Sequence, residues 1–102
     1  MHEYFKWSKV YNVAHEQGGY FIFTAEFGQD AFAGVLLPAC VDDIWNMAGS
    51  RLIQTINIKE EVANSHDEVL HRINSWMSIN LKGEFKIELN EGMAPPPETE
   101  FA

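Results

Sequence analysis

The sequence predicts one α+β domain, in which a mostly antiparallel sheet of about five strands carries two helices on one face. Three observations support this fold class. Several runs alternate apolar with polar residues, two longer segments repeat apolar residues at helical spacing, and 102 residues allow a single core. The predicted order is β-β-β-α-β-α-β, with the domain over residues 1–91 and a proline-rich acidic tail over 92–102.

The first predicted strand covers residues 4–14. Its composition favours a strand, because tyrosine, phenylalanine, tryptophan and valine dominate it, and residues 15–19 (HEQGG) are typical of a hairpin turn. Two periodicities nevertheless fit the segment. The helical one joins Tyr4, Trp7, Tyr11 and Ala14, whereas the alternating one joins Phe5, Trp7, Tyr11 and Val13.

The second strand, residues 20–27, has an apolar face and a mixed face, and a third strand over residues 33–37 stops at Pro38. The apolar face carries three phenylalanines and is expected to pack on the helices. The other face is expected to lie open to water or to a partner. Its candidate residues are Tyr4, Lys6, Ser8, Tyr20, Ile22 and Thr24.

A first helix is predicted from about Pro38 to Ala48, with Gly49 as its C-terminal cap. Its buried face would contain Ile44 and Trp45, while Asp42 and Asp43 would point outward. A fourth strand follows over residues 51–62, with Leu52, Ile56 and Ile58 as its expected buried residues.

A second helix is expected to end near Asn80, and it begins with the capping-box spacing of Ser65 and Glu68. A fifth strand over residues 83–90 alternates Phe85, Ile87 and Leu89 with charged neighbours. The tail contains three consecutive prolines, which favour an extended conformation.

The single cysteine allows two interpretations. Cys40 would lie in the first turn of the predicted helix, where the helix dipole lowers a thiol pKa, but Asp42 and Asp43 oppose that effect. A cysteine among apolar residues is more often buried and inert, so we expect Cys40 to be structural.

No other pattern predicts catalysis. His66 and His71 are five residues apart and would diverge on a helix, so we expect no metal site and no cofactor. Phosphate-binding glycine motifs are missing from the sequence, and the aromatic strand over 20–27 carries Glu26 but no basic residue. We therefore expect a protein that is not an enzyme.

Charge restricts the choice of partner. Fifteen acidic and seven basic residues give a net charge of −8, which disfavours direct binding to nucleic acid and favours a basic protein surface. One cysteine and a polar N-terminus predict a cytoplasmic protein of a bacterial host, without a membrane span. The candidate partner-binding acids are Asp30, Asp42, Asp43, Glu60 and Glu61.

Residues 18–49 resemble a family of very small acidic phage anti-CRISPR proteins. The similarity lies in a Gly-Gly-aromatic strand, an acidic turn and a Gly-Val-x-x-Pro step. It implies a protein whose acidic side chains, here Asp30, Asp42 and Asp43, occupy the DNA-binding surface of a CRISPR surveillance complex. The matching positions are Gly18, Gly19, Tyr20, Asp30, Gly34, Val35 and Pro38.

Two function classes follow. The first is a non-catalytic inhibitor or immunity-type protein that blocks a basic nucleic-acid-handling surface or a toxin. The second is a small phage or bacterial assembly protein that pairs through its open sheet face, which is compatible with a homo-oligomer. Its candidate contact residues are Tyr20 and Ile22, together with Phe101 in the tail.

Overall fold

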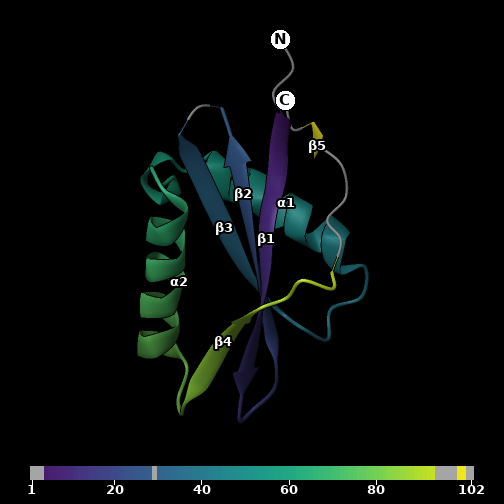
Figure 1. The fold of residues 1–102 in the computed structure, drawn as a ribbon, viewed down its shortest axis with the longest axis vertical. Coiled ribbons are helices and arrows are strands. Elements are labelled where there is room, and N and C mark those ends of the chain that lie inside the picture. The colour runs from purple at the N-terminus through teal and green to yellow at the C-terminus, as the bar shows by residue number, and fades with distance from the viewer. Residues whose placement is uncertain (1–3, 29, 94–98, 101–102) are drawn as a thin grey trace.

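The computed structural model describes residues 4–28, 30–93, 99 and 100. Four strands form an antiparallel sheet in the order β3-β2-β1-β4, and a short β5 pairs with the start of β1 (Figure 1). The predicted α+β class and the mostly antiparallel sheet are confirmed. The elements are β1 (Tyr4–His15), β2 (Tyr20–Phe27), β3 (Ala31–Pro38), α1 (Ile44–Ile56), η1 (Lys59–Glu61), α2 (His66–Asn80), β4 (Phe85–Leu89) and β5 (Thr99–Glu100).

A bulge interrupts β1 near its middle. From Trp7 to Val10 the strand advances three residues, whereas the paired positions of β2 advance two, so residues 8 and 9 together face Thr24. The Thr24 hydroxyl accepts the Lys9 N–H at 3.0 Å and donates to the Lys9 carbonyl at 3.1 Å. The side chain of Thr24 thus satisfies the backbone groups that the bulge removes from the ladder.

The extra residue changes which way β1 presents its side chains. Phe5 and Trp7 belong to one core, whereas Val13 belongs to a second core and Tyr11 packs against that second one. The alternation predicted for residues 4–14 is therefore correct as a strand but wrong in placing all four residues on one face. Sequence periodicity assumes an uninterrupted pleat, and the bulge breaks it.

The two cores lie on opposite faces of the sheet. Neighbouring residues of one strand point to opposite faces, and Phe23 lies in the first core while Ile22 lies in the second. Helix α1 contributes Ala48 and Leu52 to the first core, and α2 contributes Met77 to the second. Figure 1 accordingly shows α1 crossing behind the strands and α2 alongside β3. The prediction that both helices share one face is wrong.

This arrangement removes much of the predicted open face. Ile22 has no exposed surface and Thr24 has none, because α2 covers them; Tyr20 is half-buried against the same core. Lys6 and Ser8 are exposed as predicted. The side chain of Tyr4 lies outside what the structure describes.

Helix α1 begins and ends later than predicted. Pro38 is the last residue of β3, Gly49 is inside the helix rather than its cap, and no strand forms over residues 51–62. The predicted strand is rich in β-branched residues, but Leu52 continues the apolar spacing of Ile44 and Ala48 and is fully buried. Packing on β3 therefore outweighed local propensity. Ile56 is half-buried and Ile58 is exposed.

Helix α2 and strand β4 form as predicted. The Ser65 hydroxyl accepts the Glu68 N–H at 3.1 Å, which is the expected N-terminal cap. The Glu68 side chain bonds to the N–H of Asn64 instead of that of Ser65, so the reciprocal bond of the capping box is shifted by one residue. In the tail, residues 99 and 100 pair with the start of β1, and Phe101 lies outside the described residues.

Gly34 on β3 provides a test of how closely α2 packs on the sheet. A Cβ at this position would lie 2.5 Å from Val69 Cγ1 and 3.0 Å from Ile73 Cδ1. We expect Gly34→Ala to lower the free energy of unfolding by about 1–3 kcal/mol, as measured by urea denaturation.

Gly49 is the matched control, because it lies inside α1 and a Cβ there meets nothing within 4 Å. Gly49→Ala should raise the free energy of unfolding by about 0.5–1 kcal/mol through helix propensity. A destabilised Gly49→Ala would contradict the helical boundaries, and an unchanged Gly34→Ala would contradict the packing of α2.

Candidate binding surface

Four of the five predicted acids lie near the two ends of α1. Asp42 and Asp43 are exposed immediately before the helix, and Glu60 and Glu61 are exposed in η1, shortly after it. The 13 residues of α1 separate these two pairs. At a rise of 1.5 Å per residue, α1 itself is about 20 Å long.

Asp43 has the left-handed conformation, with φ 50° and ψ 55°, at the N-cap of α1. Its backbone carbonyl accepts the Met47 N–H at 3.2 Å, but its side chain makes no capping hydrogen bond. Aspartate commonly uses its carboxylate to cap a helix. Here the Asp43 carboxylate is instead left exposed to solvent.

Asp30 lies apart from the Asp42–Asp43 pair, in the turn between β2 and β3. Its φ of 57° is left-handed, a conformation that aspartate tolerates in turns, and its side chain is exposed. Two residues later, Phe32 exchanges backbone hydrogen bonds of 2.9 Å with Ala63, just beyond η1. Asp30 is therefore placed at the end of the sheet where η1 packs.

None of these five acids forms an ion pair with another side chain that the structure describes. Among the described residues, the ion pairs are Arg72–Glu68 at 2.6 Å and Lys86–Glu88 at 2.9 Å, and neither includes a predicted partner-binding acid. A free carboxylate needs no internal partner to be broken before it contacts a basic surface. The role of these acids in binding a partner stays a prediction.

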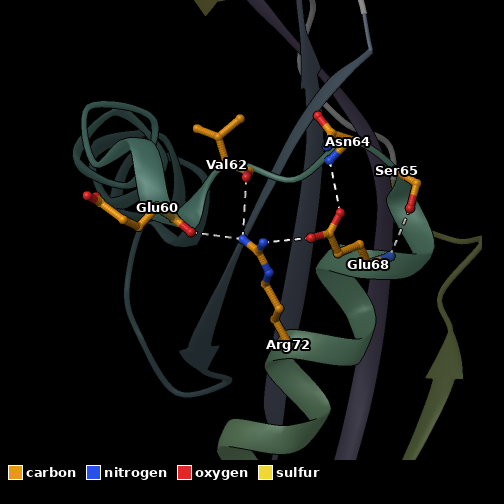
Figure 2. Close-up of polar contacts among 6 residues, drawn as sticks. All are labelled: Glu60, Val62, Asn64, Ser65, Glu68 and Arg72. Atoms are coloured by element: carbon orange, nitrogen blue, oxygen red, sulfur yellow. Dashed lines mark hydrogen bonds and ion pairs between the residues drawn. The ribbon is translucent and has the colours of Figure 1, made fainter.

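Arg72 fixes η1 against α2 (Figure 2). Its Nη1 donates to the carbonyls of Glu60 at 3.1 Å and Val62 at 3.4 Å, and its Nη2 donates to Glu68 Oε1 at 2.6 Å. Figure 2 shows the Glu60 carboxylate pointing away from Arg72 while its carbonyl faces the guanidinium. Arg72 therefore positions the backbone of η1 without neutralising the Glu60 side chain.

A groove of about 320 Å³ runs between η1 and α2. Its floor contains Gly34, and Trp76, 53% exposed, forms part of its wall. This groove could not be predicted from the sequence, because it depends on where η1 packs. Its remaining lining residues are Thr55, Glu60, Glu61, Val69, Arg72 and Ile73.

Cys40 is exposed and lies in the segment between β3 and α1, not in a helix. The expectation that it fills the core is wrong. The prediction failed because Pro38 ends a strand rather than beginning a helix, which moves the helical face away from Cys40. The residue borders a shallow hollow with Tyr20, formed where this segment crosses the β1–β2 turn.

His66, the first residue of α2, belongs to a polar cluster with Tyr11 and Thr24. The sequence did not predict these contacts. The His66 Nε2 lies 3.1 Å from the Thr24 hydroxyl and 3.4 Å from the Tyr11 hydroxyl. Partial burial, followed by the charge of Lys9, lowers the pKa of His66, and Asp67 opposes them. Burial of the Tyr11 hydroxyl and, second, the negative charge of Asp67 raise the pKa of Tyr11. The cluster attaches the start of α2 to the bulge.

The lowered pKa predicts how stability depends on pH. The unfolded chain protonates His66 near its ordinary value of about 6.5, whereas the folded chain keeps it neutral to a lower pH. The free energy of unfolding should therefore fall as the pH drops below about 6.5. Chemical denaturation across this range should show a shallower dependence for His66→Gln.

His71→Gln is the control, because His71 is exposed on the same helix. It should retain the pH dependence of the unmodified protein. Equal dependence in the His66→Gln variant would contradict the assigned role of His66.

The exposed thiol leads to a second prediction for this region. Cys40→Ala should change the free energy of unfolding by about 0.5 kcal/mol or less, as for other exposed positions. A water-soluble disulfide reagent should label the folded protein as fast as it labels the urea-unfolded chain. Labelling that requires unfolding would show that Cys40 is buried.

No group of three or more histidine, cysteine, aspartate or glutamate side chains among the described residues could hold a metal ion. In the described part of the chain, no helix is long and apolar enough to cross a membrane. No family model, curated protein or solved structure matches the chain. The resemblance of residues 18–49 to anti-CRISPR proteins stays a prediction.

Proposed function

We propose that the protein is a non-catalytic inhibitor or immunity-type protein that binds a basic, nucleic-acid-handling surface of another protein. The observation that carries this proposal is the pair of exposed acidic groups at the ends of α1. Asp42 and Asp43 form one group and Glu60 and Glu61 the other, and none has an ion-pair partner among the described residues.

Acids at both ends of a helix about 20 Å long offer negative charge along an extended surface. A channel that binds nucleic acid presents an extended row of lysine and arginine, which such a surface complements. Complementary charge of this kind accelerates encounter, and occupation of the channel then excludes the nucleic acid.

The target class is the DNA-binding surface of a CRISPR surveillance complex, or otherwise a basic toxin, in the bacterial cytoplasm. The resemblance of residues 18–49 favours the first target. Asp30 would add to the group at η1, because its turn lies beside the Phe32–Ala63 bridge. We do not extend the proposal to assembly through an open sheet face, because Ile22 is buried under α2.

Charge reversal tests the proposal. The tagged protein would be used to capture proteins from bacterial lysate, and the affinity of the captured partner would then be measured for purified variants. Asp42→Lys with Asp43→Lys, and separately Glu60→Lys with Glu61→Lys, should each weaken binding about tenfold or more. Folding should be nearly unchanged, since all four positions are exposed.

The matched control is Glu84→Lys with Glu91→Lys, which makes the same change in net charge at exposed positions flanking β4. This control should retain most of the affinity. Equal losses in all three double variants would show a response to net charge alone and would contradict a binding surface at α1. Capture of a basic partner that is not a CRISPR complex would contradict the proposed target but not the proposed binding surface.

A further inference from the structure

The two edges of the sheet are protected differently. At the β3 edge, Phe32 already exchanges two backbone hydrogen bonds with Ala63, and Pro38 has no N–H to offer. An extended chain could not pair along the whole of that edge. Strand β4 forms the other edge, and within the described residues nothing pairs with its outer side.

The orientation of the β4 backbone follows from its pairing with β1. The Asn90 N–H donates to the Val10 carbonyl at 2.9 Å, so even-numbered positions of β4 direct their backbone groups towards β1. Phe85, Ile87 and Leu89 consequently direct theirs outward. Leu89 is also 48% exposed, which leaves an apolar side chain at the same edge.

The symmetric pairing centred on Ile87 is the one that pairs all five residues of β4 and also brings opposite charges together. In this pairing, Lys86 of each copy faces Glu88 of the other, so the contact between opposite charges occurs twice. The outward backbone groups of the two strands also lie opposite one another and can form hydrogen bonds. Centring on Lys86 would oppose the two lysines, and centring on Glu88 would oppose the two glutamates. Like charges directly opposite one another destabilise a sheet, whereas opposite charges stabilise it.

We propose that a second copy of this chain pairs antiparallel along β4, in the register centred on Ile87. The two-fold axis then stands perpendicular to the sheet, which becomes continuous across the dimer, with both α2 helices on one face. Phe85 of each copy faces Leu89 of the other on that face, and this contact covers the exposed Leu89. On the opposite face, Lys86 and Glu88, now an exposed pair 2.9 Å apart, form a network of four charges.

Sedimentation equilibrium at low salt tests the dimer, over a concentration series that reaches about 1 mM, the weak end of specific affinities. Lys86→Glu alone, and Glu88→Lys alone, should each weaken self-association about tenfold or more, because each makes like charges oppose one another. An equimolar mixture of the two variants should recover it. In the mixed dimer every negative position of one copy faces a positive position of the other.

Lys6→Glu and Glu26→Lys are the matched controls, because both residues are exposed, Glu26 lies on β2, and Lys6 lies outside the part of β1 that pairs with β4. Neither should change self-association. A protein that stays monomeric throughout the series would overturn the proposal. So would a dimer that both single reversals leave intact, or a pair of variants whose mixture stays monomeric. Far-ultraviolet circular dichroism of each variant excludes loss of the fold as the cause.

Discussion

The bulge in β1 is the constraint on which the rest of the fold depends. Without the extra residue, Phe5, Trp7, Tyr11 and Val13 would all point to one face, and β1 could not contribute Tyr11 and Val13 to the core under α2. With it, the first half of β1 packs towards α1 and the second half towards α2. The hydroxyl of Thr24 makes the irregularity tolerable, because it supplies both hydrogen bonds that Lys9 would otherwise lack.

The same hydroxyl connects the bulge to the surface proposed for binding. His66 contacts Thr24 at 3.1 Å and begins α2, and Arg72, two turns later, holds the backbone of η1. Glu60 and Glu61 therefore keep their position relative to the sheet through a chain of polar contacts. These contacts use the backbone carbonyl of Glu60, and the Glu60 carboxylate points away from Arg72 (Figure 2).

The sequence was sufficient for α2 and for the four strands β1 to β4, because their apolar residues repeat at a clear period and Ser65 marks a helix start. It failed where two periods compete. Residues 51–56 contain β-branched side chains that favour a strand, yet Leu52 and Ile53 continue the buried stripe of α1. The exposure of the predicted acids could be predicted from the sequence, because charged side chains are seldom buried. The groove at Trp76 was not, because it requires knowing that η1 packs against α2.

Charge is the central element of the functional account, since the acids at both ends of α1 contact no compensating cation among the described residues. Its most direct test is the association rate constant with the captured partner, measured by surface plasmon resonance from about 50 mM to about 500 mM salt. The account predicts that this rate constant falls steeply as salt rises, while the dissociation rate constant changes little. An association rate constant that is independent of salt would contradict electrostatic recognition of a basic surface.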